Sequence, residues 1–370
     1  MSASAAVAMA SSQVPASIGT GASTASIAST SGERVLRPEF TGSASEYFRI
    51  WIVNLFFTLI TLGIYSAWAK VRKKRYFYGS TRIDGDSFDY FASPKAILKG
   101  RIVAVLLFVI YAFASELYPA SKFVFIGVFV LALPWLVVRT LAFNARNSAW
   151  RGLRFDFEAT PREAVPVYLG MPLLVAITGG IAYAWFAARS KSFVIAHHVL
   201  GTTRFGCDLR GMDFFKVYLL AGLMLIVLMM PLWMLMSVMM KGMPVPDSME
   251  WLQFMLPAAL MYLVYVIVYA YVRARTLNLQ WNGANGPGLH FTSTLKAREM
   301  ARLYIINLLA IVATAGLLIP WAVIRTLRYR LAHFTITDLS GEIYTANPAL
   351  ERVGAAGQEF GDIFNVDLGL

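Results

Sequence analysis

Long apolar runs separated by short basic stretches dominate this chain. The clearest runs are Ile102–Leu117, Phe123–Val138, Val217–Met240 and Leu252–Val272. Each approaches or reaches the roughly 20 residues that an α-helix needs to cross the core of a bilayer. Because that core offers no water to backbone groups, the runs are expected to be helices. Since they lack alternating polarity, they do not fit a transmembrane β-barrel. Taken in pairs, they predict two helical hairpins, at 102–138 and 217–272.

Three further segments, also mostly apolar, share one motif with identical spacing. A Glu is followed by Thr-x-Gly, then Trp, then Arg, and the copies begin at Glu46, Glu163 and Glu299. The identical spacing predicts one membrane unit copied three times, near 40–90, 157–210 and 291–345. The two hairpins separate these units, so the sequence predicts an all-α polytopic membrane protein with internal repeats.

Local signals mark the ends of the motif segments. Ser43 and Glu46, and likewise Thr160 and Glu163, have the spacing of a capping box. The third copy has two extra residues, which leaves Thr294 as a weaker candidate cap. Downstream of the first copy, alternating polarity over 76–90 with an Asp-Gly pair predicts a small β-hairpin. We expect such β-hairpin elements on the cytoplasmic side.

The composition supports the membrane assignment. Apolar residues make up 58% of 370 positions and charged residues only 15%, whereas about a quarter of a soluble domain is charged. The net charge of +12 comes from loops beside apolar segments, as the positive-inside bias predicts. We therefore expect membrane lipids as partners and no nucleic acid. The sequence does not identify a protein partner. A single cysteine, Cys207, excludes an intrachain disulfide.

The two ends of the chain differ from the middle. Residues 1–35 are rich in Ser and Ala and predict a disordered tail, because such a composition buries too little surface to offset ordering entropy. The membrane domain is expected over 36–347, and 348–370 form a C-terminal tail.

The Thr-x-Gly elements admit two membrane topologies. If every motif segment spans, basic loops lie on both sides of the membrane, which conflicts with the positive-inside bias. If Thr-x-Gly breaks each segment into a re-entrant pair, all basic loops share one side, and the sequence favours this model. Small residues for close helix packing are the competing interpretation. The candidate helix breaks are Thr61, Gly63, Thr178, Gly180, Thr314 and Gly316.

The Trp and Arg of each copy are four residues apart and therefore share a helix face. They suit interfacial anchors, or a lipid or anion site assembled from the three copies. The candidate contacts are Trp68, Arg72, Trp185, Arg189, Trp321 and Arg325.

Signals of catalysis are weak. The four histidines are His197, His198, His290 and His333, and no carboxylate has a familiar metal-ligand spacing beside them. No nucleotide-binding loop or nucleophile motif occurs. We expect no metal, no cofactor and no enzymatic activity.

The first copy carries a family resemblance. Phe40-x-Gly42, Glu46-Tyr-Phe, Trp51-Ile-Val-Asn54, the stretch from Thr61 to Arg72 and the stretch from Tyr76 to Gly85 resemble the YjgN-like bacterial inner-membrane proteins. The resemblance covers roughly 36–347 and implies a multi-pass protein of the bacterial inner membrane. It implies no activity, because that family is itself of unknown function. The Ser/Ala-rich start and Ala44, where the pattern tends to have Gly, depart from it.

Two functional hypotheses follow from the sequence. The first is a transporter or channel for a small solute or lipid, with broken helices forming the site. The second is a non-transporting membrane scaffold or regulator that uses its cytoplasmic β elements.

Overall fold

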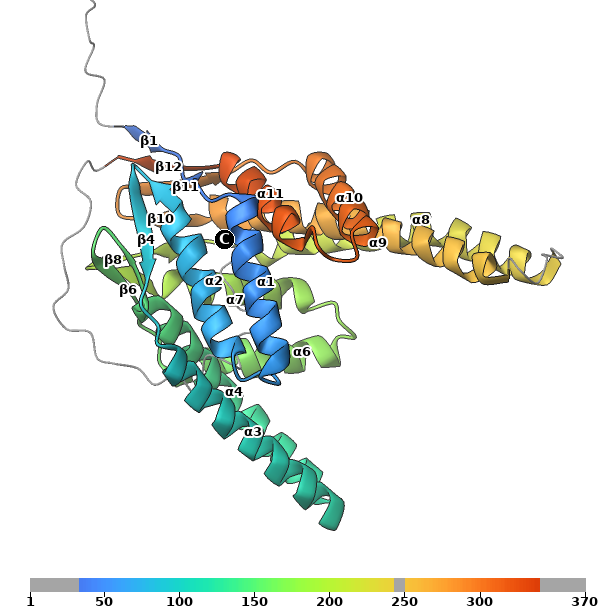
Figure 1. Cartoon of the computed structure of the whole chain (residues 1–370), viewed down its shortest axis with the longest axis horizontal. Helices are drawn as coiled ribbons and strands as arrows, with labels where there is room; N and C mark the ends of the chain where they lie inside the picture. Colours follow the sequence, from blue (N-terminus) through green and yellow to red (C-terminus); the bar gives the residue numbers. More distant parts are fainter. Residues whose placement is uncertain (1–32, 243–249, 340–370) are drawn as a thin grey trace, which may run out of the picture.

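The computed structural model describes residues 33–242 and 250–339. The tails expected at 1–35 and 348–370 lie outside the described residues, apart from 33–35. Helices dominate the described chain, and short antiparallel strands gather at one end of the molecule (Figure 1). The mostly helical class predicted from the sequence is confirmed, together with small sheets.

Two long hairpins project from the rest of the molecule (Figure 1). The first pairs α3 (Pro94–Leu117) with α4 (Ser121–Arg146), and the second pairs α8 (Gly211–Gly242) with α9 (Glu250–Asn282). Within the described residues, these four helices are long and apolar enough to cross a membrane. At most 33% of the apolar window of each helix is buried. Their apolar side chains therefore face outward, where lipid would cover them.

Each motif segment folds as helices that turn back at the Thr-x-Gly. The first comprises α1 (Ala44–Ile60) and α2 (Ser66–Ser80), and the third comprises α10 (Ala297–Ala313) and α11 (Ile319–Ala332). The second has α7 (Tyr183–Ala196) as its returning helix. Its entering arm consists of α5 (Pro161–Val165), the π-helix η1 (Pro166–Gly170) and α6 (Met171–Ile177). Pro166 lacks the amide that a regular helix would use at this point.

The strands join into two antiparallel sheets, whereas the sequence predicted only separate hairpins. The seven-stranded sheet has the order β2-β3-β4-β5-β6-β7-β8, and the five-stranded sheet has the order β1-β12-β11-β10-β9. The strands are β1 (Arg34–Leu36), β2 (Glu39–Phe40), β3 (Thr81–Ile83), β4 (Asp86–Tyr90), β5 (Ser148–Trp150), β6 (Leu153–Phe157), β7 (His198–Leu200), β8 (Thr203–Arg204), β9 (Gly206–Cys207), β10 (Ala284–Gly286), β11 (Leu289–Ser293) and β12 (Phe334–Asp338).

The two sheets form one closed strand circuit. Only Arg37 and Pro38 separate β1 from β2, and only Phe205 separates β8 from β9. A continuous segment therefore passes from one sheet to the other at each of two corners. One corner is tightly packed, because a Cβ on Gly206 would contact Oδ1 of Asn285 and would require that side chain to move. The circuit brings the first described strand, β1, beside the last, β12.

The helices form a matching ring above the strand circuit. α1 packs on α11, α2 on α3, α4 on α5 and η1, α7 on α8, and α9 on α10. Arg328 Nη2 donates to the Gly42 carbonyl at 2.8 Å and so links the third motif segment to the first. The ring and the strand circuit together surround a central space.

Candidate functional site

The three Thr-x-Gly turns have nearly the same backbone conformation. Two successive residues adopt positive φ in each turn: 48° and 92° at Leu62 and Gly63, 61° and 97° at Gly179 and Gly180, and 48° and 92° at Ala315 and Gly316. Each motif glycine also donates its amide to the carbonyl five residues earlier at 2.8 Å. This is the hydrogen bond of a Schellman-type helix end.

The threonine hydroxyl links the two helices of each turn. Thr61 Oγ1 donates to the Phe57 carbonyl at 2.7 Å and accepts the Tyr65 amide at 2.9 Å. Thr178 makes the same two bonds at 2.8 and 3.1 Å, and Thr314 makes them at 2.7 and 3.2 Å. The backbone is thus satisfied where the helix stops, and the surrounding side chains, such as Leu62 and Ile177, are exposed and apolar.

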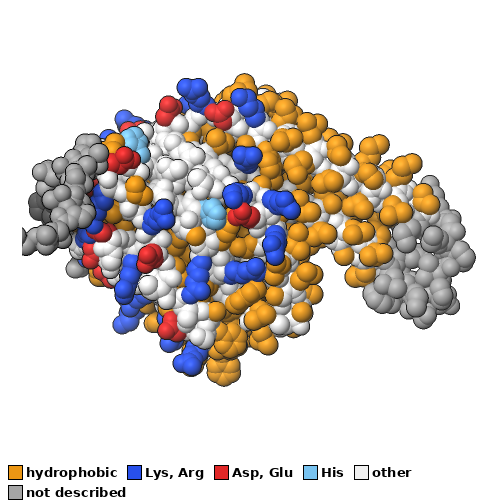
Figure 2. All heavy atoms as spheres, turned by 90° about the horizontal axis from the view of Figure 1, so that it is seen from above, with side chains coloured by type: hydrophobic (Ala, Val, Ile, Leu, Met, Phe, Trp, Pro, Cys, Tyr) orange, Lys and Arg blue, Asp and Glu red, His pale blue; other side chains and the backbone are white. Residues whose placement is uncertain are grey.

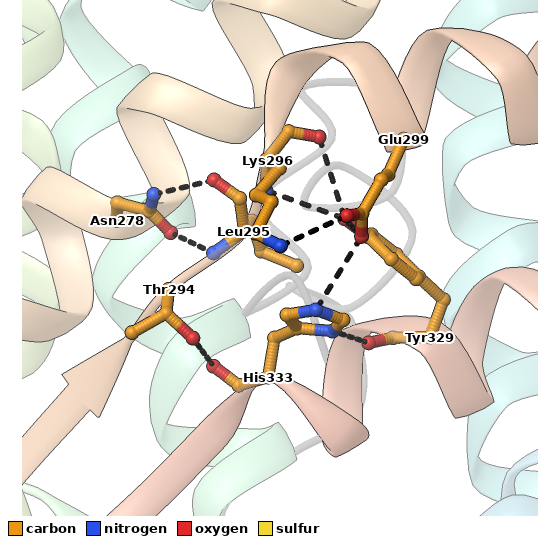
Figure 3. Close-up of polar contacts among 7 residues, drawn as sticks. All are labelled: Asn278, Thr294, Leu295, Lys296, Glu299, Tyr329 and His333. Atoms are coloured by element: carbon orange, nitrogen blue, oxygen red, sulfur yellow. Dashed lines mark hydrogen bonds and ion pairs between the residues drawn. The ribbon is translucent and has the colours of Figure 1, made fainter.

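The motif glutamate ties the start of each helix pair to its end. Figure 3 shows Glu299, at the start of α10, facing Tyr329 and His333 at the end of α11. Glu299 Oε2 accepts the Tyr329 hydroxyl at 3.2 Å and lies 3.6 Å from His333 Nε2. Lys296 Nζ donates to Glu299 Oε1 at 3.0 Å.

The other two copies make similar contacts. Glu46 accepts the Tyr76 hydroxyl at 3.2 Å, and Glu163 lies 3.9 Å from His197 Nε2. The pKa of each of the three carboxyl groups is lowered, mainly by hydrogen bonds from Ser43, Thr160 and Lys296 respectively.

The two predicted capping boxes are confirmed, and the third cap is not. Ser43 with Glu46 and Thr160 with Glu163 form complete boxes. The N-cap of α10 is Lys296, without a side-chain cap. The prediction that Thr294 caps this helix is therefore wrong. The two extra residues move Thr294 away from the helix start, and its hydroxyl donates to the His333 carbonyl instead.

A buried asparagine joins the two arms of the first and third pairs. Asn54 Nδ2 donates to the Ala69 carbonyl at 3.5 Å, and Asn307 Nδ2 donates to the Ala322 carbonyl at 3.3 Å. Arg325 donates to Asn307 Oδ1 at 3.3 Å and lies 5.0 Å from the Trp321 ring. This Arg therefore contacts the Trp of its own motif, as its helical spacing allows.

The predicted Trp and Arg residues lie outside the lining of the central cavity. Arg72 and Arg189 are exposed. Trp68 stacks on Tyr65, and Trp185 packs against Phe215. None of these residues, and none of the six candidate break residues, lines the central cavity of the described chain.

The central cavity has a volume of about 1120 Å³. Its walls come from the inner face of the strand circuit and from α2, α4, α7, α9, α10 and α11. The strands contribute mainly apolar and aromatic side chains, among them Leu36, Ile83, Phe88, Trp150, Phe155, Leu200, Phe291, Phe334 and Ile336. Charged neighbours such as Arg82, Asp89 and Arg154 are exposed on the outside, as the alternation of a strand requires.

The charged lining of the cavity has one sign. Lys70, Lys73 and Lys74 on α2 and Arg330 on α11 line it, whereas no Asp or Glu of the described residues does. Lys74 donates to Asn144 Oδ1 at 2.9 Å. The cavity therefore combines a largely apolar wall with positively charged side chains.

A row of tyrosines follows α9 along the cavity. Ring centroids of Tyr262 and Tyr265, and of Tyr265 and Tyr269, are 6.2 Å apart, and Tyr304 of α10 lies 5.8 Å beyond Tyr269. All four line the cavity. The first three are about half exposed, so the row connects the long apolar part of α9 with the interior.

In the sequence alone, the lysines that line the cavity are indistinguishable from the other basic residues between the apolar runs. Lys70, Lys73, Lys74 and Phe77 follow the i, i+3, i+4, i+7 spacing of one helix face, a signal that could have placed them together. No group of three or more His, Cys, Asp or Glu in the described part of the chain is placed to hold a metal ion.

Comparisons with known proteins agree with the membrane character of the fold. A model of the family DUF898, described as bacterial protein of unknown function, matches residues 35–363. Inner membrane protein YjgN of Salmonella typhimurium is 32% identical over 142 residues, which cover 37% of this chain and 35% of that protein. Inner membrane protein YjgN of Escherichia coli O157:H7 is 33% identical over 172 residues, which cover 44% and 42% respectively. The matches thus span less than half of each relative, and no solved structure matches.

Proposed function

This chain belongs to the DUF898 family of bacterial proteins of unknown function, and from its geometry we propose that it is a multi-pass inner-membrane transporter of an anionic lipid. The inner-membrane assignment is supported by the names of its relatives and by four helices able to span.

The observation that carries the proposal is the lining of the central cavity. About 1120 Å³ of largely apolar and aromatic wall suits an acyl chain, while three lysines and one arginine suit an anionic headgroup. A small hydrophilic solute would leave most of this wall without a partner. The absence of carboxylates from the described lining disfavours a cation.

The topology that we propose has four spans and three re-entrant helix pairs. Strands that follow the first and second motif segments, β3 and β7, belong to one sheet. If each motif segment spanned, those strands would lie on opposite sides of the membrane. Figure 2 shows Lys and Arg side chains over one part of the surface and hydrophobic side chains over the projecting end. The positive-inside bias then places the strand circuit in the cytoplasm.

Cysteine labelling tests this topology in a Cys207→Ser background. Lys122→Cys, at the first hairpin tip, should react with a membrane-impermeant thiol reagent from outside. Thr202→Cys, in the turn between β7 and β8, should react only after the cytoplasmic side is opened. Both positions are exposed. Labelling of Thr202→Cys in intact cells would contradict the re-entrant model.

The three motif segments support a proposed internal duplication. They share the positive-φ turn, the bridging threonine and the glutamate contact to the returning helix. One ancestral unit explains the equivalent roles of these positions, whereas the cavity charges are only partly repeated. Lys74 has a counterpart in Lys191, but Lys70 corresponds to Ala187 and Val323. Lys73 corresponds to Ser190 and Thr326 in the other copies. The three motif segments therefore share a backbone structure, whereas the charged side chains of the cavity differ between them.

Movement of a labelled lipid tests the transport proposal. Proteoliposomes should move tail-labelled phosphatidylglycerol between leaflets, read as loss of fluorescence after an impermeant quencher is added. Val323→Trp, which fills the cavity from α11, should slow this movement at least tenfold. Val312→Trp is the matched control, because that side chain is exposed on α10. Equal rates with empty liposomes would reject transport, and binding without movement would favour the scaffold or regulator.

A further inference from the structure

Three cationic side chains from three different helices lie near one another, and one of them lines the cavity. Arg330 of α11 lines the cavity directly. Arg273 of α9 lies close enough for its charge to act on both Arg330 and Lys191 of α7. Lys191 Nζ also donates to Oε1 of the buried Gln280 at 2.7 Å.

No acidic partner balances this cluster among the described residues. The ion pairs of the described residues include none of the three side chains. The charged or ionisable groups that act on Lys191 and Arg330 are other cations, Tyr269, Tyr304 and Cys207. Burial, with Arg273 next, lowers the pKa of Lys191 to about 8 and that of Arg330 to about 10. Lys191 and Arg330 both lie outside the four helices that could span a membrane.

A partly buried cluster of like charges costs free energy unless an anion compensates it. Three cations from three helices can surround a tetrahedral anion, and arginine matches phosphate geometry with paired N–H donors. The tyrosine row on α9 ends beside this cluster, because Tyr269 and Tyr304 both act on Arg330. The row supplies a continuous aromatic surface for the less polar part of the same ligand.

We propose that Lys191, Arg273 and Arg330 form a phosphate-binding site at the inner end of the tyrosine row. The identity of the phosphate rests on the proposed transport: if the protein transports an anionic lipid, the phosphate is that of the lipid headgroup. The cluster then selects phospholipids whose phosphate is accessible and rejects neutral diacylglycerol.

Calorimetry on the full-length protein in nonionic detergent tests the site. The probes are dioctanoyl phosphatidic acid, inorganic phosphate and, as a phosphate-free control, dioctanoylglycerol. We expect phosphatidic acid to bind, and Arg330→Gln and Arg273→Gln each to raise its Kd at least tenfold. Arg275→Gln, an exposed arginine two residues from Arg273, should leave the Kd within twofold.

A second measurement separates lost binding from lost folding. Arg330→Gln removes a partly buried positive charge that has no acidic partner among the described residues, so the melting temperature of the variant without probe should equal or exceed that of the unchanged protein. Failure of both phosphate probes to bind, or binding that survives in Arg330→Gln and Arg273→Gln, would overturn the site. At least tenfold tighter binding of phosphatidic acid than of inorganic phosphate identifies a lipid headgroup. Equal affinities for phosphatidic acid and inorganic phosphate would mean that the site binds free phosphate, and they would reject the proposed lipid transport.

Discussion

Replacing Gly63, Gly180 and Gly316 together by valine should prevent the folded protein from accumulating. These glycines have φ of 92°, 97° and 92°, a region that a β-branched residue rarely enters. Each substitution should cost about 1–3 kcal/mol of backbone strain. The sites lie in three separate turns, so the costs should nearly add. A total of ~3–9 kcal/mol is comparable to the roughly 5–15 kcal/mol that holds a typical protein folded.

Steric crowding does not explain this expectation. A Cβ at Gly63 or Gly180 would meet nothing within 4 Å, so the strain lies in the backbone itself. The measurement is the amount of monodisperse protein recovered by size-exclusion chromatography from equal membranes. A matched control changes the preceding residues, Leu62→Gly and Ala315→Gly, which already have φ of 48°. It should accumulate normally, and a triple valine variant that does the same would contradict the role of these turns.

Local patterns in the sequence predicted the main helices of this protein. The apolar runs predicted the four long helices, because only helices satisfy the backbone within lipid. The Ser43–Glu46 and Thr160–Glu163 spacings predicted two helix starts, because capping is a contact between residues three apart. The Asp84-Gly85 pair predicted the turn between β3 and β4, where both residues have positive φ.

The strand circuit and the cavity could not be predicted from local patterns in the sequence. β1 pairs with β12, so that Leu36 lies opposite Ile336 across almost the whole chain. No local pattern specifies such a partner. The same holds for Arg273 and Arg330, which counted only as positive charge until the fold brought α9 and α11 together. The repeated Trp and Arg stand out in the sequence because of their identical spacing, whereas the charges that line the cavity, such as Lys73 and Arg330, lie outside the motif.

Replacing the turn threonines by valine, as Thr61→Val, Thr178→Val and Thr314→Val together, should strongly destabilise the protein in lipid. Valine keeps the shape of threonine but lacks the hydroxyl. The Tyr65, Ala182 and Leu318 amides, which donate to these hydroxyls, would lose their partners. Each unsatisfied amide costs several kcal/mol in hydrocarbon, whereas water would replace the missing hydroxyl at a turn that it can reach.

This difference makes the substitution a test of where the turns lie. In nanodiscs, the triple valine variant should melt far below the unchanged protein, while the matched triple serine variant, which retains the hydroxyls, should melt within a few degrees of it. The exposed apolar side chains at the tips, Leu62 at 95% and Ile177 at 74%, are what a lipid-embedded turn requires. If the valine and serine variants melt alike, the turns contact water. The helix pairs would then lie on the membrane surface, because a re-entrant pair must hold its turn inside the bilayer.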